Sequence, residues 1–229
     1  MCGRFVRTTN RAPAAERELG QAFELQNGPS YNVAPGEWID IITFAGSGYR
    51  NAKARWGFLP AWSKEPRTPY STINARSESV ANSPAFRAAF RNRRCLVPAS
   101  GFYEWARRPG SGRQPYYIRV TDDEDLAFAG LWETWGAGGA DALDTCTILT
   151  TAANALVEPL HNRMPVILDP SDYVRWLDPA LQDPAAIAML LRPYPPERMQ
   201  KWPVGNAVNN TRNNHAGLIS PVDDPLIVY

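Results

Sequence analysis

The second residue of the chain could carry nucleophilic chemistry once the initiator methionine is removed. Cys2 follows Met1 directly, and methionine aminopeptidase normally removes Met1 when the next residue is small. The new N-terminus would place an α-amine with a pKa of about 7.7–8.0 beside a thiol with a pKa of about 8.5, so both groups are partly nucleophilic near neutral pH. An aldehyde condenses with such an aminothiol at the amine, and the thiol then closes a five-membered thiazolidine. A cysteine that merely happens to follow Met1 explains the same residues equally well.

Residues 73–78, which read INARSE, form a second candidate site. In an extended strand Asn74, Arg76 and Glu78 share one face. An amide and a guanidinium two residues apart suit the recognition of a phosphate or a carboxylate. The alternative is an ordinary polar strand edge, which has the same pattern.

Glu104 lies in an aromatic setting, because residues 101–105 read GFYEW. Burial among three aromatic rings would favour the protonated carboxyl group and make Glu104 a usable acid near neutral pH. The alternative is an exposed glutamate on the solvent face of an alternating strand.

His161 is one of only two histidines, and it lies beside Arg163 in the motif PLHNRMP. A loop that leads into a strand would present this imidazole, although a structural histidine bonded to a backbone carbonyl fits the motif as well. His215, in a polar run near the end of the chain, is a weaker candidate. The cysteines and histidines show no CxxC or HxxxH spacing, so we expect no metal site.

Strands must position these residues, because β-rich segments bounded by turns outnumber helical segments and follow one another along the chain. This order predicts an α+β fold with an antiparallel-dominated, curled sheet or open barrel-like core and peripheral helices. We expect one domain over residues 1–229, with a loop-rich tail from Arg192. Strands are expected at 38–44, 53–58, 95–98, 102–107, 116–120, 126–134, 145–151 and 164–168. Helices are expected after Asn10, from the Ser83 N-cap through Phe90, and at 171–177 and 184–191.

The composition is that of a folded protein, with 44% hydrophobic residues and a net charge of +1 over 229 residues. The charge is unevenly distributed: residues 50–113 carry 13 Lys and Arg against 3 acids, and residues 121–183 carry 12 acids against 2 Arg. One interpretation is a basic face for a polyanion, and the other is that the two segments pair or face water. The sequence has no secretory signal and no apolar run long enough to span a membrane, so we expect a cytoplasmic protein.

Seven blocks along the chain, taken together, resemble the SRAP family, the SOS response-associated peptidase proteins that are also called abasic site processing proteins. The blocks cover nearly the whole chain and occur in the family's order. They are MCGRF at the start, YNVAPG (31–36), WGFLPAW (56–62), INARSE, GFYEW, LHNRMP (160–165) and VGNAVNNTRNN (204–214).

The resemblance implies covalent capture of abasic sites in single-stranded DNA, with Cys2 forming a thiazolidine with the ring-opened sugar. It assigns proton transfer to Glu104 and His161, and positioning of the lesion to Asn74. It also implies no cofactor, a monomer, possible self-reversal of the crosslink or peptidase activity, and association with the nucleoid when DNA is bound. The DNA contacts implied by the family are Arg4, Trp62, Arg76, Ser77, Thr150 and Arg163.

Two features depart from the family, and three different functions remain open. Ser63 follows Trp62 where some relatives have a second aromatic residue, and residues 64–71 form a longer stretch than in some members. The first of the three functions is that of an amidohydrolase with an N-terminal nucleophile, which also begins Met-Cys-Gly, although the chain lacks the HRG motif of class II glutamine amidotransferases. The second is that of a peptidase that uses Cys2, and the third is that of a module that only binds single-stranded DNA.

Overall fold

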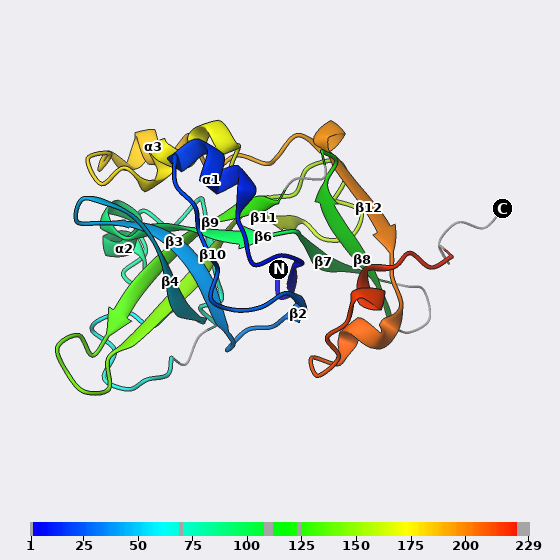
Figure 1. Ribbon diagram of the computed structural model, residues 1–229, viewed down its shortest axis with the longest axis horizontal. Coiled ribbons are helices and arrows are strands. Elements are labelled where there is room, and N and C mark those ends of the chain that lie inside the picture. Colours follow the sequence, from blue (N-terminus) through cyan, green and yellow to red (C-terminus); the bar gives the residue numbers. More distant parts are fainter. Residues whose placement is uncertain (1, 69–70, 108–111, 123–124, 224–229) are drawn as a thin grey trace.

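Two β-sheets form the body of the protein (Figure 1). The structure is a computed structural model that describes residues 2–68, 71–107, 112–122 and 125–223. The smaller sheet has the strand order β12 (Met199–Pro203), β8 (Arg113–Val120), β7 (Gly101–Arg107), β1 (Phe5–Arg7) and β2 (Ser30–Val33). The larger sheet has the order β11 (Arg163–Pro165), β10 (Leu143–Ala152), β4 (Gly48–Trp56), β3 (Trp38–Ala45), β6 (Arg94–Ala99) and β9 (Leu126–Trp135), and β5 (Asn74–Arg76) pairs with β10.

The larger sheet curls, because β9 also pairs with β10 on the far side of the strand order. Among the described strand pairs, β4 and β5 run parallel to β10 and the others are antiparallel. Short helices lie at the periphery. The predicted α+β fold, dominated by antiparallel strands, is therefore confirmed.

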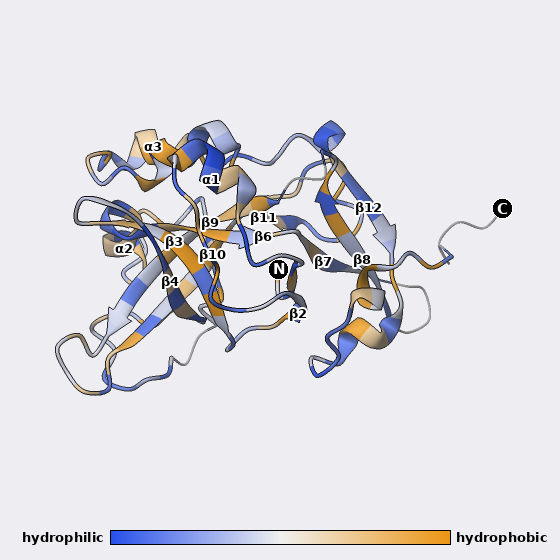
Figure 2. Ribbon diagram, viewed as in Figure 1, coloured by the Kyte–Doolittle hydropathy of each residue, from blue (hydrophilic) through white to orange (hydrophobic). Residues whose placement is uncertain are grey.

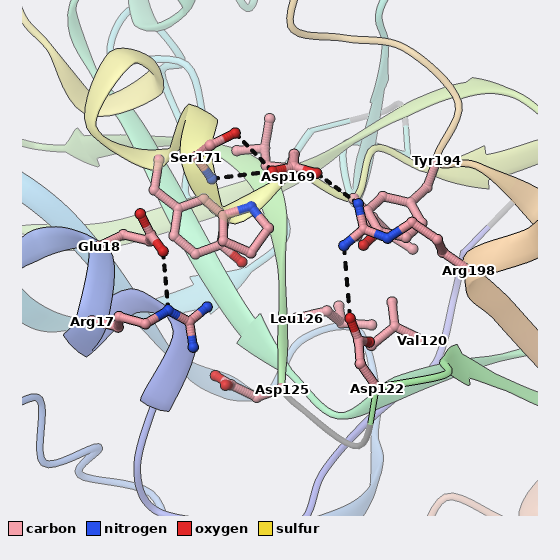
Figure 3. A pocket seen from close by; sticks show the side chains of 14 residues that line it. Arg17, Glu18, Val120, Asp122, Asp125, Leu126, Asp169, Ser171, Tyr194 and Arg198 are labelled. Atoms are coloured by element: carbon pink, nitrogen blue, oxygen red, sulfur yellow. Dashed lines mark hydrogen bonds and ion pairs between the residues drawn. The ribbon is translucent and has the colours of Figure 1, made fainter.

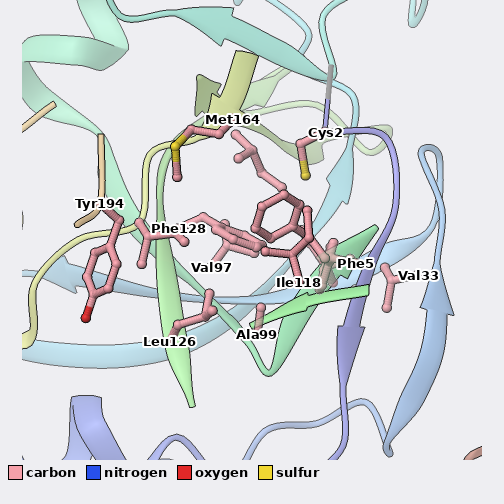
Figure 4. Packing of buried hydrophobic residues seen from close by; sticks show 14 of the residues in the cluster. Cys2, Phe5, Val33, Val97, Ala99, Ile118, Leu126, Phe128, Met164 and Tyr194 are labelled. Carbon is pink, nitrogen blue, oxygen red and sulfur yellow. The ribbon is translucent and has the colours of Figure 1, made fainter. Parts of the chain in front are cut away.

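Hydrophobic and hydrophilic residues are interspersed along the strands (Figure 2). Because side chains alternate between the two faces of a strand, the core separates into layers. In β9, Phe128 faces the layer shared by the two sheets, whereas its neighbours Ala127 and Ala129 face the helices. Phe5 of β1 packs against Trp56 and Phe128 with ring centroids 5.3 and 5.9 Å apart. The inter-sheet layer is therefore aromatic and closely packed, and Cys2 lies within it (Figure 4).

Helices cover the opposite face of the larger sheet (Figure 1). Pro13 starts α1 (Pro13–Leu19) within its first turn, and Gly20 ends it in the left-handed conformation at φ +70°. None of the helices in the described ranges is long and apolar enough to cross a membrane. The other helices are α2 (Arg87–Asn92), α3 (Tyr173–Leu177) and α4 (Pro184–Ala188), with short 3-10 turns at Pro170–Asp172, Pro196–Arg198, Asn206–Asn209 and Ala216–Ile219.

Several predicted elements differ from the structure at their boundaries; for example, the helix expected at 184–191 ends at Ala188. The helix expected to begin at Ser83 begins at Arg87, because residues 83–86 first form a turn in which the Arg87 amide donates to the Ser83 carbonyl at 2.9 Å. The strand expected to continue to Phe58 ends at Trp56, where Gly57 adopts φ +140°.

The strand expected at 164–168 is shortened to β11. Beyond Pro165 the backbone no longer pairs with one strand, because the Val166 amide donates to the Leu149 carbonyl of β10 while the Val166 carbonyl accepts from the Ala129 amide of β9. The tail from Arg192 was expected to be loop-rich, yet it contains β12, which completes the smaller sheet against β8. The prolines before and at the end of β12 obscured this strand in the sequence, and its pairing with β8 stabilises it.

Candidate active site

The register between β1 and β7 brings the start of the chain next to Glu104. Phe5 pairs with Phe102, and the Tyr103 amide donates to the Arg4 carbonyl at 3.0 Å. Continuing this antiparallel register sets Gly3 opposite Glu104, with Cys2 one residue beyond. The Cys2 side chain is fully buried and its sulfur points into the inter-sheet cluster (Figure 4).

Glu104 is a buried acid in the strand predicted to carry it. Its side chain is on the same face of β7 as Phe102 and Ala106, which belong to the inter-sheet core, and the residue is 5% exposed. Burial raises the pKa of Glu104 above its ordinary value. The prediction of a buried carboxyl group is confirmed, and the alternative of an exposed glutamate is wrong.

The Cys2 thiol and the Glu104 carboxyl group interact electrostatically. Burial, followed by the charge on Glu104, raises the pKa of the Cys2 thiol to about 12. The thiol is therefore protonated at neutral pH, and the nearest acidic group could exchange a proton with it. This arrangement needs a base or a proton acceptor before the sulfur can attack.

Glu104 and His161 line one pocket, which has a volume of about 450 Å³. The Nδ1 atom of His161 accepts a hydrogen bond from the Arg163 amide at 2.9 Å, so the neutral ring carries its proton on Nε2. Burial is the main cause that lowers the pKa of His161. The other residues that line the pocket are Trp105, Arg107, Arg113, Glu158, Pro159, Leu160 and Asn162.

Asn154, which was not predicted as a site residue, builds the loop that presents His161. Its Oδ1 accepts from the amides of Leu156 and Val157 at 3.1 and 3.0 Å, and its Nδ2 donates to the Tyr194 carbonyl at 2.6 Å. The His161 amide then donates to the Val157 carbonyl at 3.1 Å. No local signal marks Asn154 in the sequence, because its partner Tyr194 lies 40 residues away.

The predicted residues of the INARSE motif lie along β5 and the turn that follows it. Asn74 and Arg76 pair with Ile148 and Thr150 of β10, and the Ser77 amide donates to the Thr150 carbonyl at 2.8 Å. The Asn74 Nδ2 donates to the Ile148 carbonyl at 3.3 Å, whereas its Oδ1 is buried without a partner among the described residues. Arg76 is exposed. The strand covers only Asn74–Arg76, and Glu78 lies in the turn that follows it, so the expected shared face holds for Asn74 and Arg76 and is wrong for Glu78.

Arg163 is held by the protein itself. Its guanidinium donates to both carboxylate oxygens of Glu78 at 2.5 and 2.9 Å and to the Thr150 carbonyl at 2.6 Å. Thr150 is 1% exposed. These contacts join β10, β11 and the turn after β5, so the predicted DNA contacts of Thr150 and Arg163 would need this cluster to rearrange.

Arg4 connects the start of the chain with the 3-10 turn at Asn206–Asn209. Its Nη1 donates to the Asn32 Oδ1 at 2.6 Å and to the Val208 carbonyl at 2.8 Å, and its guanidinium lies 5.8 Å from the ring centroid of Trp105. Asn32, which was also not predicted as a site residue, is buried and donates to three backbone carbonyls of residues 208–213.

Trp62 lies on a surface turn and is 69% exposed. The next residue, Ser63, accepts a hydrogen bond at its carbonyl from the Trp135 indole at 2.7 Å, so the β9–β10 hairpin supports the turn. Trp62 does not line the pocket of Glu104 and His161.

A family model described as SOS response associated peptidase (SRAP) matches residues 1–211. The chain belongs to the SRAP family. It is 40% identical over 221 residues to the abasic site processing protein YoqW of Bacillus subtilis, covering 96% of this chain and 99% of YoqW. It is 29% identical over 230 residues to the abasic site processing protein YedK of Escherichia coli, covering 97% and 100%. A crystal structure of a protein from Bacteroides thetaiotaomicron is 26% identical and has a TM-score of 0.83, covering 96% of this chain and all of the other.

A second pocket of this SRAP protein, of about 350 Å³, contains none of the predicted site residues (Figure 3). Its charged side chains bind one another: Arg198 contacts Asp169 at 2.8 Å and Asp122 at 3.7 Å. In this pocket Arg17 and Arg198 lie among four acids, and Arg198 is already ion-paired. The pocket of Glu104 and His161 instead has a buried acid and an imidazole, and Cys2 is not among the residues that line it.

The basic segment 50–113 does not form one uniform surface of the SRAP fold. Arg94 is buried and donates to five backbone carbonyls, and Arg93 forms an ion pair with Glu133 at 2.5 Å. The interpretation of the whole segment as a DNA-facing patch is therefore wrong for these two residues. Within the described ranges, no group of three or more His, Cys, Asp or Glu residues could hold a metal ion.

Proposed function

We propose that this SRAP protein captures abasic sites in single-stranded DNA by forming a covalent bond with Cys2 after removal of Met1. Relatives at 29% and 40% identity are named abasic site processing proteins, which supports this lesion as the target. The observation that carries the proposal is the electrostatic interaction of the buried Cys2 thiol with Glu104, which lines a pocket together with His161.

The proposed reaction needs no co-reactant besides the ring-opened sugar aldehyde. The α-amine of Cys2 adds to the aldehyde carbon, and loss of one water molecule gives an imine. The sulfur of Cys2 then adds to the imine carbon while the thiol proton reaches the nitrogen. The product is a thiazolidine, and the overall change is one water molecule released for each crosslink formed.

The buried Glu104 and the half-buried His161 match the proton transfer and the hydrogen bonding that this sequence of steps requires. Glu104 can take the thiol proton, because the two groups already interact in the folded protein. The neutral ring of His161 can donate a hydrogen bond from Nε2 to the sugar oxygen as the ring opens, because its Nδ1 accepts from the Arg163 amide. The Oδ1 of Asn74, which has no partner among the described residues, is a hydrogen-bond acceptor for a hydroxyl of the sugar.

The DNA strand is proposed to reach the pocket through cationic and aromatic contacts. Exposed Arg76 can bind a phosphate, and exposed Trp62 can stack on a base. Arg4, Ser77, Thr150 and Arg163 are the remaining proposed contacts, and the last two require the cluster around Glu78 to rearrange. We propose that the protein acts as a monomer, and that the same pocket can reverse the crosslink.

A peptidase or amidohydrolase that uses Cys2 is the second candidate, because the family description names a peptidase. Such an enzyme would attack an amide carbon with the thiol, with the α-amine as base. The buried thiol fits an intramolecular or small substrate, and the same pocket would serve.

Incubation with a single-stranded oligonucleotide that contains one abasic site, followed by denaturing gel electrophoresis, tests the proposal. The mature protein, confirmed by mass spectrometry to begin at Cys2, is expected to give a shifted band that survives denaturation. Cys2→Ala and an oligonucleotide with an intact thymine should give no band. Cys146→Ala is the matched control, because it removes another buried thiol that has no α-amine beside it.

An absent band from the mature protein would contradict covalent capture. Release of ammonia from glutamine, or cleavage of a peptide library that depends on Cys2, would then support the second candidate.

A further inference from the structure

The mouth of the pocket beside Glu104 carries two arginines that the proposed chemistry does not use. Arg107 ends β7, Arg113 begins β8, and the two residues pair directly in the antiparallel register. Both line the pocket and both are exposed. Within the described ranges, neither guanidinium has a carboxylate within ion-pair distance.

This pairing is unfavourable in the absence of an anion. Directly opposed residues on adjacent antiparallel strands have Cβ atoms about 4.5–5.5 Å apart, and like charges at such positions destabilise the sheet. An anion that binds both guanidiniums would remove the repulsion and would gain charge-assisted hydrogen bonds.

Other arginines of the basic segment are already used within the protein. Arg94 binds backbone carbonyls, Arg93 binds Glu133, and Arg67 binds Glu65. Arg107 and Arg113 differ from these three because they make no ion pair within the described ranges and lie at the pocket that Glu104 and His161 line.

We propose that Arg107 and Arg113 form a clamp for one of the two phosphodiesters that flank the abasic sugar. The inference rests on the proposed function, since it takes the sugar to be in the pocket of Glu104 and His161. A phosphodiester adjacent to that sugar is one backbone unit from the reacting carbon, and two guanidiniums at the mouth of the pocket match its two unesterified oxygens. The clamp would fix the sugar with its aldehyde carbon toward Cys2.

Glu158 allows a test in which a change of charge should affect DNA affinity in the opposite direction to the arginine variants. It lines the same pocket and is exposed, without an ion-pair partner in the described chain. Its negative charge opposes a phosphate at the two arginines, so Glu158→Gln is expected to strengthen DNA binding while Arg107→Gln and Arg113→Gln weaken it.

Equilibrium binding in a Cys2→Ala background measures the clamp without the covalent step. With a fluorescent single-stranded oligonucleotide containing one abasic site, each arginine variant should bind about five- to tenfold more weakly at low salt. The Arg107→Gln/Arg113→Gln double variant should also reduce the slope of log affinity against log salt concentration by about 0.7, because one phosphate contact to a single strand is then lost. Arg87→Gln is the matched control, since it removes one exposed positive charge from α2, away from the pocket.

Replacing single phosphates identifies the partner. A neutral methylphosphonate is placed either 5′ or 3′ of the abasic site. At one of these positions the methylphosphonate should weaken binding to the Cys2→Ala protein that keeps both arginines. The Arg107→Gln/Arg113→Gln double variant in the same background should lose no further affinity when the phosphate at that position is replaced. Competition by inorganic phosphate alone, with equal loss at both methylphosphonates, would assign the site to free phosphate and would overturn the clamp.

The clamp would also be overturned if the Arg107 and Arg113 variants bound DNA as tightly as Arg87→Gln. It would be overturned equally if the affinity lost in the arginine variants added fully to the affinity lost with each of the two methylphosphonate oligonucleotides. These results are separate from the fate of the covalent chemistry. A missing crosslink with the mature protein refutes the proposed function, whereas the binding measurements with Cys2→Ala report only on the clamp.

Discussion

The helix-covered face of the larger sheet, which carries Arg94, and the layer between the two sheets, which Glu104 of β7 in the smaller sheet faces, use buried charge in opposite ways. On the helix-covered face, Arg94 is 5% exposed and its guanidinium donates to the carbonyls of Phe90, Arg91, Trp176, Asp178 and Leu181 at 2.5–3.0 Å. On the inter-sheet face, the buried Glu104 has a raised pKa and an adjacent thiol. The Arg94 guanidinium has hydrogen-bond acceptors on all sides, whereas burial favours the neutral form of the Glu104 carboxyl group.

The physical difference lies in the partners. Arg94 binds carbonyls at the ends of α2 and α3, where unpaired carbonyls and the helix dipoles favour a cation. Burial still lowers the pKa of Arg94 to about 10, so it remains charged at neutral pH. Glu104 has a backbone amide at 3.2 Å, donated by Trp105, but its burial is the dominant influence. The first arrangement stabilises the fold, whereas the second sacrifices stability for proton transfer.

Replacing Arg94 should produce the largest change, and it should appear in stability. Arg94→Ala leaves five carbonyls without their donor, so we expect the free energy of unfolding to fall by about 4 kcal/mol. Urea denaturation measures this loss, and Arg91→Ala, an exposed arginine of the same helix, is the control. The rate of DNA capture per folded molecule should not change, and a specific loss of capture would erase the distinction between the two faces.

Replacing Glu104 should produce the next largest change, and it should have opposite signs in activity and stability. Glu104→Gln is expected to slow capture about 100-fold, which corresponds to about 2.7 kcal/mol, because the proton acceptor is lost. The same variant should unfold a few degrees higher at pH 7, since the amide removes the cost of a buried carboxylate.

The pH dependence of that stability follows from the raised pKa of Glu104. The folded protein binds this proton more tightly than the unfolded chain, so stability falls as the pH rises through the interval between the ordinary value of 4.5 and the raised pKa. The advantage of Glu104→Gln should therefore shrink toward zero below the ordinary pKa. Thermal unfolding from pH 4 to pH 8 measures it, and an advantage that grows toward low pH would refute the assignment.

Replacing Trp62 should have the smallest effect, and it should be limited to binding. Trp62→Ala is expected to weaken binding to single-stranded DNA by about 1–2 kcal/mol, because one stacking platform is lost. Trp38→Ala is the matched control, since Trp38 is 50% exposed but belongs to no predicted contact. Fluorescence anisotropy distinguishes the two, and equal losses would remove the special role of Trp62.

Local sequence was sufficient for most elements and for the chemical character of the site. Alternation and turn residues predicted the strands β3, β4 and β6 to β10, because these signals act within a few residues. The aromatic neighbours of Glu104 predicted a buried acid, and its raised pKa agrees. β12 and the delayed start of α2 were not predicted, since the first depends on pairing with β8 and the second on a turn that replaces the expected cap.

The sequence by itself determined which groups could react: an N-terminal cysteine, an acid among aromatic rings, and a histidine beside an arginine. Only the tertiary structure decided which of them meet. The pairing of β1 with β7 brings the start of the chain to the strand of Glu104, with which Cys2 interacts electrostatically. Asn154 fixes the loop before His161 through a hydrogen bond to the carbonyl of Tyr194, 40 residues further along the chain. Chemical reactivity is a property of single side chains and their neighbours, whereas the meeting of distant groups depends on sheet register and on buried polar contacts that no local pattern encodes.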